Sequence, residues 1–213
     1  MYEDQCFLNF DEYFRYRAVA ELIDSIGKKE LAILDVGGGA GRFLNFLQKH
    51  NAVSVDLKLG VDGTKLPYED LSFDVVTSID ALEHVLKKGR AKFIKEMVRV
   101  SRLKAILAFP HRDATDATHF INKFTKGWLQ EHVDKGLPAR QEVEEILNQL
   151  PVTYKVHQNL DVAVWATMTI AEWFAPQEQK RKLNKRFNRL FYNAPINGTC
   201  YRLVYEIESI MEV

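Results

Sequence analysis

The sequence is poor in the features that mark several protein classes. Its 213 residues include only two cysteines, Cys6 and Cys200, which lie far apart and show no CxxC or cysteine–histidine spacing. We therefore expect no disulfide framework and no zinc site, assign no metal ligands, and take a reducing compartment as the default. No apolar run approaches the roughly 20 residues that cross a bilayer, and the N-terminal MYEDQCFLNF lacks the basic segment of a secretory signal. We therefore expect a cytoplasmic protein.

An excess of charge of one sign is also missing. Lys plus Arg and Asp plus Glu number 29 each, so the formal net charge is zero, which gives no global attraction to nucleic acid or to an anionic membrane. The segment KRKLNKRFNRLFY (180–192) is the local exception, with six basic residues and no acid. It predicts an amphipathic helix whose basic face is either solvated or a weak contact site for an anionic surface.

The order of apolar segments predicts an α/β fold. Strands are predicted at 31–36, 52–56, 72–79, 105–109, 152–157 and 199–209. Helices are predicted at 13–26, 40–50, 87–100, 141–150, 161–174 and 177–192. Continuous apolar strands that alternate with helices are typical of a parallel sheet covered on both faces, and the last two strands predict an antiparallel pair at its edge.

This rhythm breaks after Pro110, where the polar segment 111–140 predicts an inserted lid within one domain that spans 1–213. The segment 161–174 is strongly apolar, with Asp161 as the expected N-cap. Core packing is the default interpretation of that helix, and an acceptor pocket or a membrane contact is the alternative.

The stretch ILDVGGGAGRFL (33–44) places four glycines within five residues, directly after a predicted buried strand. Glycines at the carboxyl end of such a strand let a ligand approach the backbone closely, and a following helix would offer free N–H groups. A dinucleotide loop, GxGxxG, would need a third glycine where Arg42 stands. The observed order is Asp35-x-Gly37-x-Gly39-x-Gly41, in which Gly38 has no assigned role.

This order resembles motif I of the class I S-adenosylmethionine-dependent methyltransferases, of the small-molecule, type 11-like kind. The segment VDGTKLPYEDLSFDVVTSIDALEHV (61–85) is similar to a second, more specific stretch of that family. The resemblance covers about residues 30–110. One departure is Ser101-Arg102-Leu103-Lys104, which replaces the family's PGG turn at the end of the strand away from the cofactor.

The resemblance implies a Rossmann-like, doubly wound, mostly parallel seven-stranded sheet with an antiparallel last strand. It also implies S-adenosyl-L-methionine as cofactor and S-adenosyl-L-homocysteine as product. In the family, acids matching Asp56 and Asp62 bind the ribose hydroxyls and the adenine amine. The full implied cofactor set is Asp35, Gly37, Gly39, Gly41, Asp56, Leu57, Asp62, Gly63, Ser78 and Ile79. Taken singly, Asp56 could be a turn cap and Asp35 a loop brace.

Methyl transfer relies largely on positioning, and a general base helps when the acceptor is a hydroxyl. The candidates are Asp113 and three histidines: His84, just past the third predicted strand, His111, after the fourth, and His119 in HFINKFT. Each histidine could instead be structural or solvated. At the end of the third predicted strand the sequence reads Ser78-Ile79-Asp80-Ala81 and contains no NPPY-type motif. This disfavours amino-group methylation of nucleobases or glutamine.

The predicted function is therefore methyl transfer, expected at oxygen, to a small-molecule acceptor, with glycans and lipid-linked molecules among the candidates. Two alternatives stay open: an NAD-dependent oxidoreductase, against which Arg42 argues, and a non-catalytic methyltransferase-like binding module. The acceptor's identity and the oligomeric state are not readable from the sequence.

Overall fold

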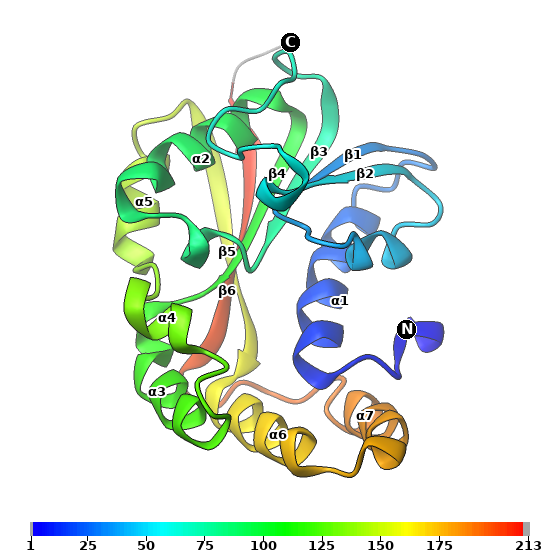
Figure 1. The fold of residues 1–213 in the computed structure, drawn as a ribbon. Helices are drawn as coiled ribbons and strands as arrows, with labels where there is room; N and C mark the ends of the chain where they lie inside the picture. The colour runs from blue at the N-terminus through cyan, green and yellow to red at the C-terminus, as the bar shows by residue number, and fades with distance from the viewer. Residues whose placement is uncertain (1, 211–213) are drawn as a thin grey trace.

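Six β-strands form one mixed sheet in the computed structural model, which describes residues 2–210 (Figure 1). The strands are β1 (Ala32–Val36), β2 (Asn51–Val55), β3 (Phe73–Ile79), β4 (Ser101–Pro110), β5 (Val152–Asp161) and β6 (Cys200–Ser209). Their order in the sheet is β2-β1-β3-β4-β6-β5. The first four run parallel, whereas β6 is antiparallel to both β4 and β5. The predicted fold class and the antiparallel edge pair are confirmed.

The expected number of seven strands is wrong, since the described residues contain six. Between η3 and β3, residues 61–72 form only turns, bends and irregular chain. The Asp62 carboxylate accepts the backbone N–H and the hydroxyl of Thr64, which folds this segment back on itself. Pro67 has no N–H to donate to a ladder, and Leu71 has a positive φ of 56°.

Seven α-helices and five short 3₁₀-helices complete the part of the chain that the structure describes. The α-helices are α1 (Phe10–Asp24), α2 (Lys87–Val100), α3 (Thr115–Phe124), α4 (Gln130–Lys135), α5 (Arg140–Leu147), α6 (Val162–Phe174) and α7 (Gln177–Leu190). The 3₁₀-helices are η1 (Glu3–Gln5), η2 (Arg42–Phe46), η3 (Leu57–Leu59), η4 (Leu82–His84) and η5 (Arg112–Ala114).

The helix expected over 40–50 is the main error in the helix predictions. Only the five residues of η2 are helical, and they begin after Gly41 in the left-handed conformation. The side chains of Phe43 and Phe46 turn into the core against Tyr16, and the chain must reach the start of β2 at Asn51. The residues between η2 and β2 form turns and bends, so no helix dipole of useful length follows the glycines.

Two apolar cores lie on opposite faces of the sheet (Figure 1). On one face, Val19 and Ile23 of α1 belong to the same cluster as Ile33 of β1. On the other face, Phe93 of α2 and Val143 of α5 share a cluster with the central strands. Both faces of the parallel strands are therefore buried, as their continuous apolar sequences predict.

Side-chain caps explain where two helices begin. The Asn9 side chain accepts the N–H of Glu12 at 2.7 Å, so α1 starts three residues earlier than its apolar spacing predicts. Asp161 accepts the N–H groups of Ala163 and Val164, and the predicted N-cap of α6 is confirmed.

Segment 111–140 forms η5, α3 and α4, which lie beyond the end of β4 (Figure 1). Helix α3 packs on α6, which in turn contacts α1 and α7. None of the helices within residues 2–210 combines the length and the apolar character that a membrane crossing requires.

Candidate functional site

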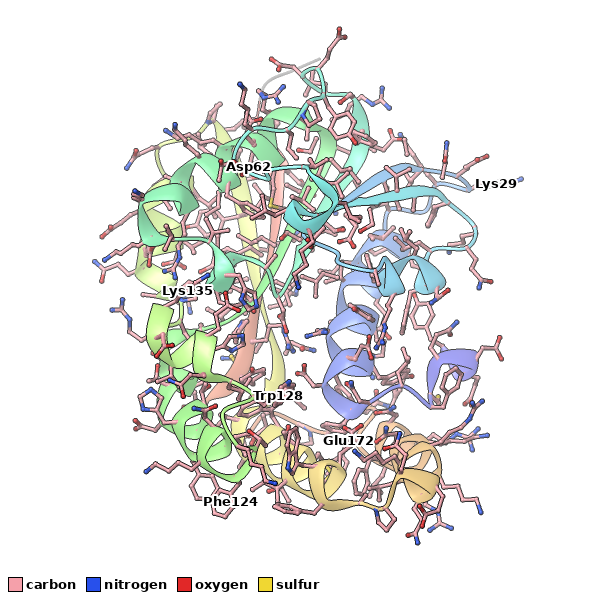
Figure 2. The ribbon with its side chains drawn as sticks, viewed as in Figure 1. Lys29, Asp62, Phe124, Trp128, Lys135 and Glu172 are labelled. Atoms are coloured by element: carbon pink, nitrogen blue, oxygen red, sulfur yellow. The ribbon has the colours of Figure 1, made fainter. Side chains whose placement is uncertain are left out.

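The largest cavity described, of about 820 Å³, opens where β1, β2 and β3 end. We call it the main cavity. It falls within the range of about 300–1,000 Å³ that is typical of small-molecule sites. Seven of the residues predicted from the sequence line it: Gly37, Gly39, Asp56, Leu57, Asp62, Gly63 and His84. Residues of α2 and α4 complete the wall, and Figure 2 shows Asp62 and Lys135 on the same side of the molecule.

The glycine loop after β1 needs its bare backbone at two lining positions. Gly37 has a φ of +80°, and a Cβ there would lie 2.5 Å from the Cβ of Ala81. Gly39 has a φ of +56° with open space around it, so its conformation rather than crowding favours glycine. Gly41 is also left-handed, but it starts η2 and does not line the cavity.

Asp35 lies beneath this loop, with only 1% of its surface exposed. Its carboxylate accepts hydrogen bonds from the hydroxyls of Thr77, at 3.0 Å, and Ser54, at 3.3 Å. Burial raises the pKa of Asp35 to about 6, against the opposing effect of these two hydrogen bonds. A Cβ on Gly38 would lie 1.9 Å from Asp35 Oδ2. Glycine at position 38 therefore lets the loop pack directly against the Asp35 carboxylate. This packing role of Gly38 cannot be read from the motif alone.

Asp56 joins the loops that follow β1 and β2. Its Oδ2 accepts the N–H of Gly39 at 3.0 Å, and its Oδ1 accepts the N–H of Lys58 at 2.8 Å. A carboxylate has about four lone-pair sites, so two remain for hydroxyl donors of a ligand. The neighbouring Leu57 leaves 73% of its surface exposed at the cavity, where an apolar ring could cover it.

Asp62 and Gly63 form the opposite rim. The two hydrogen bonds from Thr64 lower the pKa of Asp62 below its usual value, so this carboxylate is an anionic acceptor at neutral pH. A Cβ on Gly63 would lie 2.4 Å from the ring of Phe93. Glycine therefore lets the backbone of this turn lie flat between α2 and the cavity.

At the end of β3, the cavity is lined by residues next to the predicted pair. Ser78 and Ile79 are buried within the strand, and the next two residues, Asp80 and Ala81, line the cavity instead. Asp80 has a φ of +50°, an unfavourable conformation for a residue with a side chain. Its N–H donates to the carbonyl of Ala108 at 2.9 Å, which helps to hold this bend.

An ion network fixes the Asp80 side chain. Arg202 of β6, which is fully buried, donates to both carboxylate oxygens of Asp80, and Arg15 of α1 donates to Oδ2 at 2.8 Å. Arg202 also reaches Asp11 at 2.9 Å and Asn159 at 3.0 Å. Burial alone would raise the pKa of Asp80, but the two guanidinium groups outweigh it and hold the value at about 2.

Sequence reasoning misses this network because its members come from α1, the end of β3, β5 and β6. The signal that could have indicated it is Arg202 within the mostly apolar run TCYRLVYEI. A charged residue in a buried strand needs partners, but its sequence does not say which.

A second missed group lies beside His84. Glu83 is 1% exposed, and neither of its carboxylate oxygens has a hydrogen-bond partner among the described residues. Burial, with a further contribution from Asp80, raises the pKa of Glu83 well above its usual value. His132 of α4 packs its ring 5.1 Å from that of His84, and burial lowers the pKa of His132. His84 Nδ1 lies 3.0 Å from a carboxylate oxygen of Glu131.

The three histidines predicted as catalytic have different surroundings. Only His84 lines the main cavity. His111 is buried, with Nε2 2.9 Å from the carbonyl oxygen of Cys200, and His119 is exposed on α3. The geometry therefore favours His84 over the other two, and a catalytic role of any of the three stays a prediction.

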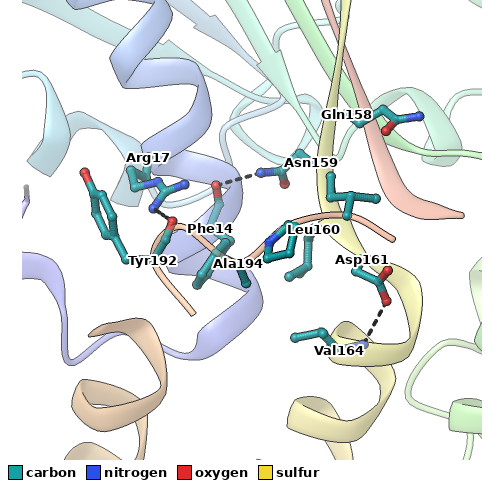
Figure 3. A pocket seen from close by; sticks show the side chains of 11 residues that line it. Phe14, Arg17, Gln158, Asn159, Leu160, Asp161, Val164, Tyr192 and Ala194 are labelled. Carbon is teal, nitrogen blue, oxygen red and sulfur yellow. Dashed lines mark hydrogen bonds between the residues drawn. The ribbon is translucent and has the colours of Figure 1, made fainter. Parts of the chain in front are cut away.

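A smaller cavity of about 100 Å³ lies between α1, the end of β5 and the chain after α7 (Figure 3). Its polar side chains already bond to backbone groups: Arg17 donates to the carbonyl of Tyr192 and Asn159 to that of Phe14. It holds none of the predicted site residues and is too small for a nucleoside.

Comparison with known proteins identifies relatives of this chain. Residues 34–109 match a family described as "Methyltransferase domain". Norajmaline N-methyltransferase of Rauvolfia serpentina is 28% identical over 192 residues, which cover 75% of this chain and 62% of that protein. The chain therefore spans about three fifths of the length of this curated relative.

Solved structures share the fold. The plantazolicin methyltransferase BpumL in complex with SAH superimposes with a TM-score of 0.57 at 13% identity, covering 96% of this chain and 85% of that one. The magnesium protoporphyrin IX methyltransferase (ChlM) of Synechocystis PCC 6803, also with bound SAH, gives a TM-score of 0.56 at 12% identity, covering 94% and 85%.

Proposed function

We propose that this chain, which carries a class I S-adenosylmethionine-dependent methyltransferase domain, binds S-adenosylmethionine in the main cavity and transfers its methyl group to a small-molecule acceptor. The family match confirms the resemblance inferred from Asp35, Gly37, Gly39 and Gly41. The observation that carries the proposal is the meeting of the glycine loop, Asp56 and Asp62 around one cavity of sufficient size.

The residues present fit that cofactor. The free lone pairs of Asp56 suit a ribose diol, and Asp62 with the backbone at Gly63 suits an adenine edge. The bare backbone of Gly37 and Gly39 lets a ligand lie against the loop. Bound S-adenosylmethionine supplies an activated methyl group on a sulfonium. The chain's own task is to orient the acceptor in line with that group and to exclude water.

We assign the acceptor side to the end of the main cavity formed by α4, with 111–140 acting as a lid inside a single domain. Glu131 and Lys135 of α4 line this end. Lys135 also donates to the carbonyl of His84 at 2.9 Å, which ties the lid to the loop after β3. His84 is the candidate base because it alone among the predicted histidines reaches the cavity.

Oxygen remains the proposed acceptor atom, since a hydroxyl is the acceptor that gains most from a base at His84. Nitrogen is the second candidate, because the curated relative from Rauvolfia serpentina is by name an N-methyltransferase. An amine that is already unprotonated needs no base, so the two acceptors predict different responses to His84→Ala.

We further propose that a lipid-linked or glycan acceptor is presented at the end of the molecule that carries α6 and α7. Lys182 and Arg186 of α7 are exposed there, and they could make a weak contact with an anionic surface.

The direct test is transfer of a labelled methyl group from S-adenosylmethionine to a panel of small hydroxyl and amine compounds. Product formation that is lost in Asp56→Ala supports the proposal. Binding of NAD instead of S-adenosylmethionine would favour an oxidoreductase, and cofactor binding without turnover on any acceptor would favour a non-catalytic module. Loss of activity in His84→Ala with hydroxyl acceptors only would support a role of His84 in the deprotonation of the acceptor.

A further inference from the structure

Glu83, His84 and His132 bring one carboxylate and two imidazoles together at the acceptor end of the main cavity. One ligand atom from each lies within 4.8 Å of the other two. Glu83 Oε1 lies 4.0 Å from His84 Nε2 and 3.9 Å from His132 Nε2. Donor atoms around a tetrahedral zinc ion are about 3.4 Å apart, given bonds of about 2.0–2.1 Å, so a small closing of the side chains suffices.

The hydrogen bonds around these side chains leave the ligand atoms free. His84 Nδ1 lies 3.0 Å from Glu131, and a proton on Nδ1 leaves the Nε2 lone pair toward Glu83. This arrangement of carboxylate, histidine and ligand atom is typical of metal-binding histidines. Glu83 is 1% exposed, and neither of its carboxylate oxygens has a partner within residues 2–210.

The charged groups near these residues pair with one another and leave Glu83 without a partner. Arg15 and Arg202 balance Asp11 and Asp80 through direct ion pairs. Lys135 balances Glu131 at 2.6 Å. The buried carboxyl group of Glu83 has no such partner among these groups, and burying a polar group without a partner is costly. A cation between Glu83 and the two imidazoles would remove that cost.

We infer that Glu83, His84 and His132 form a binding site for a divalent first-row transition metal. Two imidazoles and one carboxylate suit ions such as Zn²⁺ or Co²⁺ rather than Mg²⁺, which prefers oxygen ligands. Three protein ligands leave at least one coordination position open. Of the three ligands, His84 lines the main cavity, so an open position on its side would face the acceptor.

If the proposed methyl transfer holds, an acceptor hydroxyl bound at this position would lose its proton more readily, because a metal lowers the pKa of a bound oxygen donor. That consequence rests on the proposed function. The metal site itself does not, since it can be measured without cofactor or acceptor.

The test uses the full chain, stripped with a chelator and titrated with Co²⁺ or Zn²⁺ alone. We expect one tightly bound ion per chain and a visible Co²⁺ absorption spectrum changed by imidazole coordination. Glu83→Gln and His132→Gln should each weaken binding by at least about tenfold, and Glu131→Gln by less. His119→Gln changes an exposed histidine outside the site and serves as the matched control.

Circular dichroism and S-adenosylhomocysteine binding verify that each variant is folded. Glu83 lies on η4 and His132 on α4, so if one variant fails to fold the other still tests the site. Absence of stoichiometric metal binding by the wild type, or equal loss in His119→Gln, would overturn the inference. Chelation that abolishes methyl transfer but leaves cofactor binding intact would link the ion to the acceptor. Metal binding without any methyl transfer would support the site while contradicting the proposed function.

Discussion

At the scale of single residues, Gly38 shows how the loop and its brace depend on each other. A methyl group on Gly38 would overlap both Asp35 Oδ2 and Ser54 Oγ, which lie 1.9 and 2.2 Å from the ideal Cβ position. Because Asp35 is itself buried and hydrogen-bonded, neither partner can easily move away. Gly38 is thus a packing requirement of the cavity floor rather than a contact to the ligand.

We expect Gly38→Ala to lower the free energy of unfolding by about 1–3 kcal/mol and to weaken cofactor binding, because the glycine loop must move away from the Asp35 side chain. Chemical denaturation and calorimetry would measure the two effects. Gly198→Ala is the control, since its Cβ would meet nothing within 4 Å. Equal stability of the two variants would show that the loop does not rest on Asp35.

Asp35 should also contribute to the pH dependence of the free energy of unfolding. Its pKa in the folded protein is about 6, above the value of roughly 3.9 for an exposed aspartate. The folded state therefore holds a proton that the unfolded state has lost, so this residue's contribution to stability falls as the pH rises from about 4 to 6.

Replacing Asp35 by Asn removes this titration. We expect the stability of Asp35→Asn relative to wild type to increase across that window by up to about 3 kcal/mol. Denaturation at a series of pH values would measure the difference in free energy of unfolding between the two proteins. The contributions of titratable groups common to both proteins cancel in this difference. A difference that does not change with pH would contradict the raised pKa.

At the scale of secondary-structure elements, the Arg202 network holds α1, the end of β3 and β6 around the main cavity. The guanidinium is fully buried and bonds to Asp80, Asp11 and Asn159. It fixes Asp80 at a strained backbone position on the cavity wall. The C-terminal strand therefore contributes to the site although none of its residues lines the main cavity.

Replacing Arg202 by Met should lower the free energy of unfolding by about 3–5 kcal/mol, because Asp80 and Asp11 would be left buried without one of their cations. Urea denaturation would measure the change. Arg140→Ala breaks an exposed pair with Glu144 on α5 and should cost less than about 1 kcal/mol. Similar losses in both variants would mean that the buried network does not hold these elements together.

The elements also show how far the sequence determines the structure. The strands at 31–36, 52–56 and 72–79 were predictable because an apolar run before a polar turn has few other solutions in an α/β chain. The α-helix over 40–50 was not, since the aromatic packing of Phe43 and Phe46 overrides helical spacing. The lack of a seventh strand depends on the turn that Asp62 and Thr64 form, which no periodicity reveals.

Some residues of the candidate site could likewise be predicted from the sequence, and others could not. Gly37, Gly39, Asp56 and Asp62 could be predicted because they follow strands directly and the topology brings strand ends together. Glu83 and His132 could not, because α4 returns to the cavity from a segment whose path the sequence does not specify. The Asp80–Arg202 pair joins residues 122 positions apart and is equally hidden.

At the scale of the whole molecule, α3, α6 and α7 lie at one end (Figure 1), where Figure 2 labels Phe124 and Trp128. Phe124, Trp128 and Phe174 expose between 46% and 64% of their surface. The ring of Trp128 lies 6.1 Å from that of Trp173, which joins the turn after α3 to α6. Such a surface beside a basic helix is typical of proteins that contact a membrane interface.

We expect weak binding to vesicles that contain anionic lipid, which weakens with added salt because of charge screening. The double variant Lys182→Glu/Arg186→Glu should reduce it at least several-fold in a sedimentation assay. Lys95→Glu/Lys155→Glu changes the same number of exposed charges elsewhere and should leave it unchanged. Equal effects of the two double variants would indicate a general response to net charge and not a defined surface.

The central claim is that the main cavity is a site for S-adenosylmethionine, and calorimetric titration with S-adenosylhomocysteine tests it most directly. We predict one binding site per chain in the wild type and at least about tenfold weaker binding in Asp56→Ala, which loses the carboxylate at the junction of the two loops. Asp113→Asn, an exposed carboxylate outside the cavity, should bind as the wild type does. A wild-type chain that binds no S-adenosylhomocysteine would contradict the account.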